Sequence, residues 1–284
     1  MATYQKVDEA AQYLKSKITC EPKYAVVCGS GLGGLGEMVQ DKTIVKYSDI
    51  PYFGRSTVAG HKGQLVFGKL SGKYVVCMQG RFHPYEGYQP WEISFPIRVM
   101  RLIGVELLMV TCAAGGINPI FKVGDVMLIK DHMSFPVMSG YTPLSGPNEE
   151  KFGPRFPSLL NAYDRDLRAL LRQCCEDLNY GKYIREGVLC NVFGPSFETV
   201  AELRMLKMLG GDCVSMSTIP EVITARHAGI KVTGFTLITN ECCTEYDDLE
   251  KTVCHEEVLE AANQRAKDLQ TIVLKFFEVL PVNV

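Results

Sequence analysis

Two stretches of the sequence combine glycine, arginine and histidine in ways that suit the binding of a small anion. Residues 29–34 read Gly-Ser-Gly-Leu-Gly-Gly and directly follow an apolar run. The backbone N–H groups of such a loop, with those of a helix start, converge on one concavity that favours negative charge. Arg81 and His83 follow a second apolar run and stand two residues apart, so in an extended segment their side chains project to the same side. An arginine fork matches phosphate oxygens. These residue types indicate a phosphate site.

Two further turns follow apolar runs and add candidates for the same site. Residues 112–116 read Cys-Ala-Ala-Gly-Gly, a turn in which the backbone can approach a ligand closely. Thr218 and Glu221 have the spacing of a capping box, and Pro220 suits the first turn of a helix. A helix that starts there leaves free N–H groups beside Ser217, which makes this serine a fourth candidate anion ligand.

The glycine loop also matches G-x-G-x-x-G, and Asp49 lies 20 residues after its first glycine, so a dinucleotide site is an alternative. Only eight residues separate the last glycine from the next strand-like run at Thr43. That is too short for the crossover helix of a βαβ unit. A Walker loop fails as well, because Leu35 stands where lysine is needed.

Each candidate also has a plain structural interpretation, and these interpretations stay open at this point. The glycine loop could be a simple turn, Arg81 a surface ion pair, and His83 a hydrogen-bonded histidine of the core. The Ala-Ala-Gly-Gly turn could serve close packing alone.

Strands that alternate with helices must position these residues. Apolar runs rich in Val, Ile and Leu predict strands at 24–28, 64–67, 74–78, 107–111, 126–129, 188–193, 212–216 and 232–239. Helical patterns occupy 91–103, 163–178, 198–209, 220–228 and 256–277. This alternation predicts one α/β domain over residues 1–284, with a twisted, largely parallel sheet covered on both faces. Ligands bind beyond the carboxyl ends of strands in such sheets, which is where the candidates lie.

Composition narrows the classes of function. The net charge of −2 gives no reason to expect attraction to nucleic acid or anionic lipid. Eleven cysteines without a Cys-x-x-Cys pair favour a reducing compartment and no structural metal. The first 21 residues are polar and amphipathic, and no window of 18 apolar residues occurs. We therefore expect a cytoplasmic location, with neither membrane nor nucleic-acid partners.

Five motifs in order resemble the trimeric purine nucleoside phosphorylases over about residues 24–280. They are Gly-Ser-Gly-Leu-Gly (29–33), Ser-Thr-Val-Ala-Gly-His (56–61), Gln-Gly-Arg-Phe-His (79–83), Gly-Pro-Ser-Phe-Glu-Thr (194–199) and Met-Ser-Thr-Ile-Pro-Glu (216–221). The resemblance implies a single phosphorylase/hydrolase-like α/β domain around a mixed central sheet flanked by helices, and a homotrimer. It implies no cofactor, with inorganic phosphate as co-substrate.

The resemblance also implies a role for each matching residue. Phosphate would be held by Ser30, His61, Arg81, His83, Ala113 and Ser217. The nucleoside would contact Tyr85, Ala114, Phe156, Phe197, Glu198, Val214, Met216, Asn240 and His255, with Phe156 reaching into a neighbouring subunit. The residues expected to act in catalysis are Asn240, Glu198, His83 and His255.

The implied reaction is reversible phosphorolysis of a purine (deoxy)ribonucleoside to the free base and (deoxy)ribose 1-phosphate, in purine salvage. An amide at Asn240 goes with 6-oxopurines such as inosine and guanosine in the resembling family. Methylthioadenosine phosphorylases carry aspartate there, so that activity is the alternative enzyme. A weakly active nucleoside-binding homologue is the alternative outside enzymes.

Four positions depart from the family pattern, namely Pro84, Cys112, Ser215 and the segment 241–243. We expect them to cluster around the base pocket and its covering loop. A hydroxyl at Ser215 would occupy space near the purine or offer it a hydrogen bond. The hypothesis that follows is an altered base preference, against neutral drift at tolerant positions.

Overall fold

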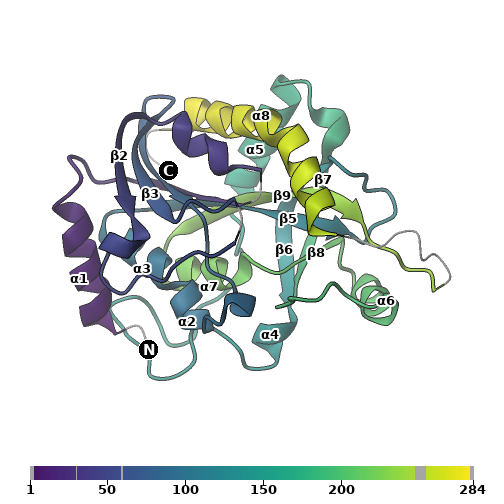
Figure 1. Ribbon diagram of the computed structural model, residues 1–284, viewed down its shortest axis with the longest axis horizontal. Coiled ribbons are helices and arrows are strands. Elements are labelled where there is room, and N and C mark those ends of the chain that lie inside the picture. The colour runs from purple at the N-terminus through teal and green to yellow at the C-terminus, as the bar shows by residue number, and fades with distance from the viewer. Residues whose placement is uncertain (1–2, 30, 59, 247–253, 282–284) are drawn as a thin grey trace.

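One mixed β-sheet organises the computed structural model, which describes residues 3–29, 31–58, 60–246 and 254–281 (Figure 1). Within the described residues the sheet has nine strands in the order β2-β3-β4-β1-β5-β8-β7-β6-β9. The strands are β1 (Tyr24–Cys28), β2 (Gln40–Lys46), β3 (Gln64–Leu70), β4 (Lys73–Gln79), β5 (Leu107–Gly116), β6 (Val126–Ser134), β7 (Ile184–Asn191), β8 (Cys213–Ser215) and β9 (Lys231–Glu241). The predicted α/β class and the mixed central sheet that the resemblance implies are confirmed. The largely parallel sheet that the strand–helix alternation predicts is wrong, because β2–β3, β3–β4, β5–β8 and β6–β9 pair antiparallel in the described residues.

The sheet is not simply open, because β9 pairs with two strands. It runs antiparallel to β6 and parallel to β5, so β5, β8, β7, β6 and β9 form a closed ring. The sheet continues outside this ring from β5 through β1, β4, β3 and β2. The sequence pattern predicts the strands but not this closure, since nothing local marks a strand that pairs on both sides.

Helices cover both faces of the sheet, as the pattern predicts (Figure 1). They are α1 (Tyr4–Lys15), α2 (Pro90–Ile93), α3 (Phe95–Leu102), α4 (Phe135–Met138), α5 (Arg165–Asp177), α6 (Val200–Met208), α7 (Ile219–His227) and α8 (His255–Val279). The predicted helix at 91–103 is divided at Ser94, which ends α2 and begins α3. The helix α4 is a single turn that directly follows β6.

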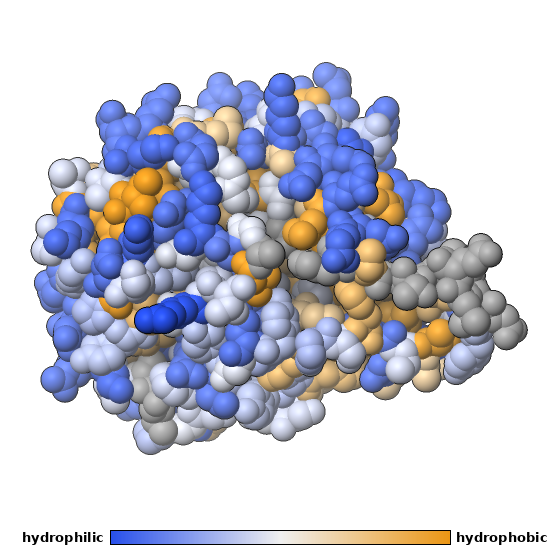
Figure 2. All heavy atoms as spheres, in the orientation of Figure 1, coloured by the Kyte–Doolittle hydropathy of each residue, from blue (hydrophilic) through white to orange (hydrophobic). Residues whose placement is uncertain are grey.

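Strand β1 shows how the two covering layers create the core. All five of its residues are buried, and successive side chains point to opposite faces. Ala25 and Val27 belong to the cluster under α1, α3 and α7, whereas Val26 and Cys28 belong to the cluster under α5 and α8. A continuous apolar run is what a strand buried on both faces requires. Outside this core, Figure 2 shows polar and charged residues over most of the visible face, with apolar residues in separate groups.

The glycine loop runs into only a short 3-10 helix, η1 (Gly33–Glu37), whose first two residues are the last two glycines of the loop. The next strand, β2, is antiparallel to β3 at the edge of the sheet. A βαβ crossover is therefore absent from this part of the described chain, as the eight-residue spacing predicts. Gly29 packs directly on β5, because a Cβ there would lie 2.5 Å from the carbonyl oxygen of Thr111.

Candidate active site

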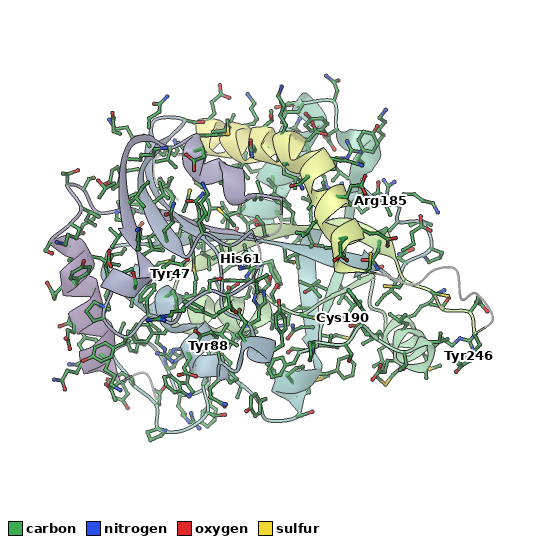
Figure 3. All side chains as sticks on the ribbon, in the orientation of Figure 1. Tyr47, His61, Tyr88, Arg185, Cys190 and Tyr246 are labelled. Carbon is green, nitrogen blue, oxygen red and sulfur yellow. The ribbon has the colours of Figure 1, made fainter. Side chains whose placement is uncertain are left out.

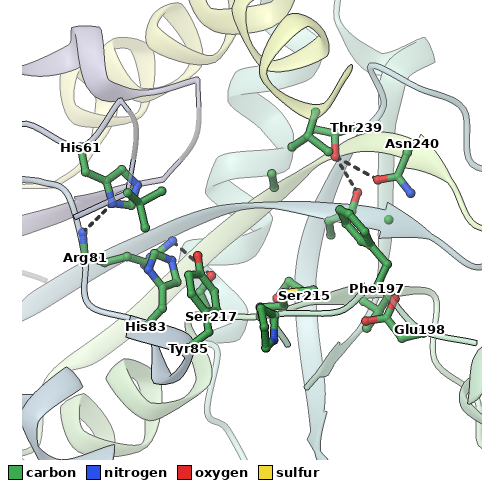
Figure 4. Close-up of a pocket in the computed structure, with 18 residues that line it drawn as sticks. His61, Arg81, His83, Tyr85, Phe197, Glu198, Ser215, Ser217, Thr239 and Asn240 are labelled. Carbon is green, nitrogen blue, oxygen red and sulfur yellow. Dashed lines mark hydrogen bonds between the residues drawn. The ribbon is translucent and has the colours of Figure 1, made fainter. Parts of the chain in front are cut away.

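A cavity of about 360 Å³ lies beyond the ends of several strands, where the sequence places the candidates (Figure 4). Segments after β4 and β8 supply one side, and the last residues of β5 and β9 supply the other. Its lining consists of Val58, His61, Arg81, His83, Tyr85, Ala113, Ala114, Gly115, Pro195, Phe197, Glu198, Val214, Ser215, Met216, Ser217, Thr239, Asn240 and Val258.

Arg81 lies at one end of the cavity and is paired with a carboxylate. Its Nε and Nη2 atoms donate to the two oxygens of Glu221 at 3.1 and 3.0 Å. Its Nη1 donates to the carbonyl oxygen of Thr111 at 2.7 Å and to Ser217 Oγ at 3.4 Å. The Arg81 and Glu221 side chains are 3% and 1% exposed, so this is a buried ion pair rather than the surface pair that was the alternative.

His83 is held by a second carboxylate. Glu86 Oε1 lies 2.8 Å from His83 Nδ1 and also accepts the His83 backbone N–H, while Oε2 accepts two hydrogen bonds from Thr57. Burial by itself raises the pKa of Glu86, but the hydrogen bonds from His83 and Thr57 outweigh it and lower the pKa to about 2. An ionised Glu86 only accepts, so the Nδ1 of His83 carries hydrogen and Nε2 is left for a ligand.

His61 offers a donor without a charge. Burial, and then the nearby His83 and Arg81, lower the pKa of His61 to about 4. Its ring stacks on His83 with centroids 5.5 Å apart, and its Nδ1 accepts the Arg81 backbone N–H at 3.4 Å. At neutral pH the other nitrogen of His61 is therefore an N–H donor. Figure 3 places His61 in the half of the molecule that contains Tyr47 and Tyr88.

The opposite end of the cavity carries groups suited to a flat heterocycle (Figure 4). Thr239 Oγ1 lies 3.3 Å from Asn240 Oδ1, which leaves the Asn240 amide hydrogens for a ligand. Burial raises the pKa of Glu198, so its carboxylate is less well hydrated than a surface one and gains more from a bound N–H donor. The Phe197 ring is 44% exposed at the mouth and supplies a stacking surface.

The structure brings most of the predicted site residues to this one cavity. Those that line it are His61, Arg81, His83, Tyr85, Ala113, Ala114, Phe197, Glu198, Val214, Met216, Ser217 and Asn240. Ser30 lies outside the described residues, as does the side chain of His255, whose backbone begins α8. Phe156 is 89% exposed and does not line the cavity. The described members of the glycine loop do not line it either, so that part of the phosphate prediction stays a prediction.

Sequence reasoning assigned Glu221 the wrong partner. The capping-box spacing predicts that Glu221 caps the helix at Thr218, but Thr218 makes no side-chain cap and has a φ of 80°. The Glu221 carboxylate binds Arg81 instead, because a buried guanidinium without a counter-charge costs far more than an uncapped helix. Glu86 and Thr239 were also missed. Glu86 lies three residues after His83, a spacing that could have marked the pair.

Among the four departures from the family pattern, only Ser215 belongs to the cavity lining of the described residues. Cys112 is buried in β5, Pro84 starts a short 3-10 helix, and Glu241 forms an ion pair with Lys122 at 3.3 Å. Pro84 and Cys112 nevertheless adjoin lining residues in the sequence, and a Cβ on Gly115 of the lining would lie 2.6 Å from Cys242 Sγ, so these departures surround the cavity without lining it. The Ser215 hydroxyl itself is fully buried and has no hydrogen-bond partner, so it does not reach a base in this conformation.

Because that hydroxyl is buried and unpaired, Ser215→Ala is expected to raise the free energy of unfolding by about 1 kcal/mol. Urea denaturation of the two proteins measures the difference. Ser134→Ala is the matched control, because Ser134 is equally buried but donates to Asn191 Oδ1 at 3.0 Å. The control is expected to lose stability by about the same amount, and a loss in both variants would refute the prediction.

Two negative findings concern the described residues only. They contain no cluster of three or more His, Cys, Asp or Glu side chains arranged to hold a metal ion. They also contain no helix with the length and apolarity needed to span a bilayer.

The mixed α/β sheet and the cavity at its strand ends are those of the phosphorylase superfamily, whose family model matches residues 23–278. Within that superfamily the chain belongs to the purine nucleoside phosphorylases. The purine nucleoside phosphorylase of Bos taurus is 50% identical over 281 residues, which cover 99% of this chain and 97% of the relative.

Solved structures of the family superpose closely on this chain. The Schistosoma mansoni purine nucleoside phosphorylase in complex with inosine has a TM-score of 0.95 at 44% identity, covering 99% of this chain and 98% of that one. Isoform 2 from the same organism, solved with cytosine and ribose-1-phosphate, has a TM-score of 0.94 at 44% identity with the same coverage.

Proposed function

We propose that this protein catalyses the reversible phosphorolysis of purine nucleosides, chiefly 6-oxopurine ribosides and deoxyribosides. The observation that carries the proposal is the division of one cavity into two ends. Arg81, His83, His61 and Ser217 offer anion donors at one end, and Asn240 and Glu198 offer a paired donor and acceptor at the other. A nucleoside that spans the cavity would place its C1′ between the anion-binding end and the base-binding end. The inosine complex of the Schistosoma mansoni relative supports this assignment.

The reaction follows from the charges that such a complex develops. The C1′–N9 bond breaks with its electron pair going to the purine, while a phosphate oxygen uses a lone pair to form the new bond to C1′. The proton of hydrogen phosphate ends, through water, on the released base. Asn240 donates to N7 or O6, where negative charge grows, and Glu198 accepts from N1–H. Phosphate itself faces the positive charge that develops on the ribose, as carboxylates do in glycoside hydrolysis.

An assay with a nucleoside panel tests the proposal. The protein is incubated with inosine, guanosine, adenosine, methylthioadenosine and cytidine, with and without inorganic phosphate, and free base and ribose 1-phosphate are measured. Phosphate-dependent release of hypoxanthine and guanine is expected. Release from methylthioadenosine alone would favour the alternative enzyme, and ligand-dependent thermal stabilisation without release would favour a binding protein.

The proposal extends to a homotrimer in the cytoplasm that uses phosphate as co-substrate and needs no cofactor. Phe156 supports the trimer, because an aromatic side chain that is 89% exposed in the single chain gains from burial in a neighbouring site. Phe156→Ala is then expected to raise the KM for inosine about tenfold, with phosphate KM nearly unchanged.

Steady-state kinetics measure the KM values for inosine and phosphate, and light scattering measures the oligomeric state. Leu160→Ala is the control, since Leu160 is 97% exposed in the same loop region but carries no aromatic ring. A monomer in solution, or an unchanged KM for inosine in the Phe156 variant, would overturn this part of the proposal.

A further inference from the structure

The buried ion pair between Arg81 and Glu221 changes what Arg81 can offer to phosphate. A guanidinium has five N–H donors. Two of them go to Glu221 and one to the Thr111 carbonyl. A fourth goes to Ser217 (Figure 4), which leaves one on Nη2. The fork that would otherwise clasp two phosphate oxygens is therefore occupied by a carboxylate of the same geometry. Arg81 can therefore donate one hydrogen bond from Nη2 to the anion, while most of its positive charge is compensated by Glu221.

The other charged groups around this end do not restore a positive field. Glu86 is ionised, since its pKa is about 2, and lies against His83. His61 is neutral above pH 5, since its pKa is about 4. Arg81 and Glu221 cancel, so the permanent charges of this end sum to no net positive value. Phosphate binding then depends on directed hydrogen bonds rather than on neutralisation.

We propose that Glu221 is a positioning residue that neutralises Arg81, so that bound phosphate keeps its negative charge for the ribose. The inference rests on the proposed function and concerns the rate at which bound phosphate attacks C1′. An uncompensated guanidinium would bind the phosphate dianion more tightly in the ground state. It would also repel the developing cation at C1′ and weaken the nucleophile, so tighter binding would come with a slower reaction.

Glu221→Gln tests the inference, because glutamine keeps the shape and one acceptor but removes the charge. With inosine and inorganic phosphate, the phosphate KM is expected to fall about tenfold and kcat to fall about tenfold, with the KM for inosine changed by less than about twofold. A purely structural role for Glu221 would raise the phosphate KM as Arg81 moves. A phosphate KM that rises or stays constant overturns the inference.

The matched control is Glu186→Gln, because Glu186 also forms ion pairs with arginines, Arg168 at 3.4 Å and Arg172 at 2.9 Å, but lies outside the cavity lining. Its kinetic constants are expected to match the parent protein. If the Glu221→Gln protein does not fold, Glu221→Asp decides, since its retracted charge compensates Arg81 only in part. A lower phosphate KM in that variant supports the inference, and an equal or higher one overturns it. Absence of phosphorolysis in the parent protein would instead refute the proposed function.

Discussion

Asn240→Ala is expected to lower kcat/KM for inosine by about 10²- to 10³-fold, the largest kinetic effect among the substitutions proposed for this protein. The Asn240 amide lies at the end of β9 with its oxygen 3.3 Å from the Thr239 hydroxyl, so its N–H groups are aimed before the base arrives. A donor fixed in advance stabilises the negative charge of the leaving purine at no cost of reorganisation. The loss should therefore fall mainly on kcat.

Asn240→Asp makes this expectation specific to the base. An aspartate accepts but does not donate when ionised, so inosine loses the same stabilisation, while the 6-amino group of adenosine gains an acceptor. The ratio of kcat/KM for adenosine to that for inosine should rise by about two orders of magnitude. Asn161→Ala, at an exposed position, is the control and should change neither value. Equal losses for both nucleosides in the aspartate variant would show that Asn240 does not contact the purine.

The strands of this fold could be predicted because their signals are local. Each buried strand reads as a short apolar run, and Arg81 and Ser217 were found because they follow two of these runs and line the cavity. Asn240 was assigned through the family resemblance alone. The closure of the ring by β9 could not be predicted in this way. It depends on which distant strands meet, and the runs that form β5, β6 and β9 look alike in the sequence.

The partners of the site residues were harder to predict than the residues themselves. Glu221 has the local spacing of a helix cap, but its carboxylate pairs with Arg81, which lies 140 residues earlier in the chain. A local pattern cannot reveal a contact of that separation. For Phe156 the expected partners belong to another subunit, so they cannot be found within a single chain.

Glu86→Ala is expected to lower the free energy of unfolding by about 3–5 kcal/mol, the largest effect on stability. The Glu86 side chain is 4% exposed and accepts four hydrogen bonds, two from His83 and two from Thr57. Removing it leaves the two His83 donors buried without an acceptor, so the cost exceeds that of a lost surface pair, whereas the exposed Thr57 donors can turn to water. Thermal unfolding should shift down by roughly 10 °C.

Glu37→Ala is the matched control for this effect. The pKa of Glu37 is also lowered to about 2, through hydrogen bonds from Lys62 and then Lys42, but its side chain is 55% exposed. Exposed ion pairs contribute little to stability, so the control should unfold at nearly the temperature of the parent protein. Similar losses in both variants would mean that the lowered pKa, rather than the burial of the carboxylate, determines the effect.

The pH dependence of stability provides a second measurement on Glu86. Its folded-state pKa of about 2 lies below the ordinary 4.5, so the folded protein binds fewer protons than the unfolded chain between these values. The stability that Glu86 contributes is therefore complete above about pH 4.5 and is lost progressively as the pH falls toward 2, by about 3 kcal/mol in total. Glu86→Gln cannot titrate, so its unfolding free energy should fall less steeply than that of the parent protein below pH 4.5. Parallel curves for the two proteins would show that His83 and Thr57 do not hold Glu86 in its ionised form, and with that the fixed orientation of His83 would lose its basis.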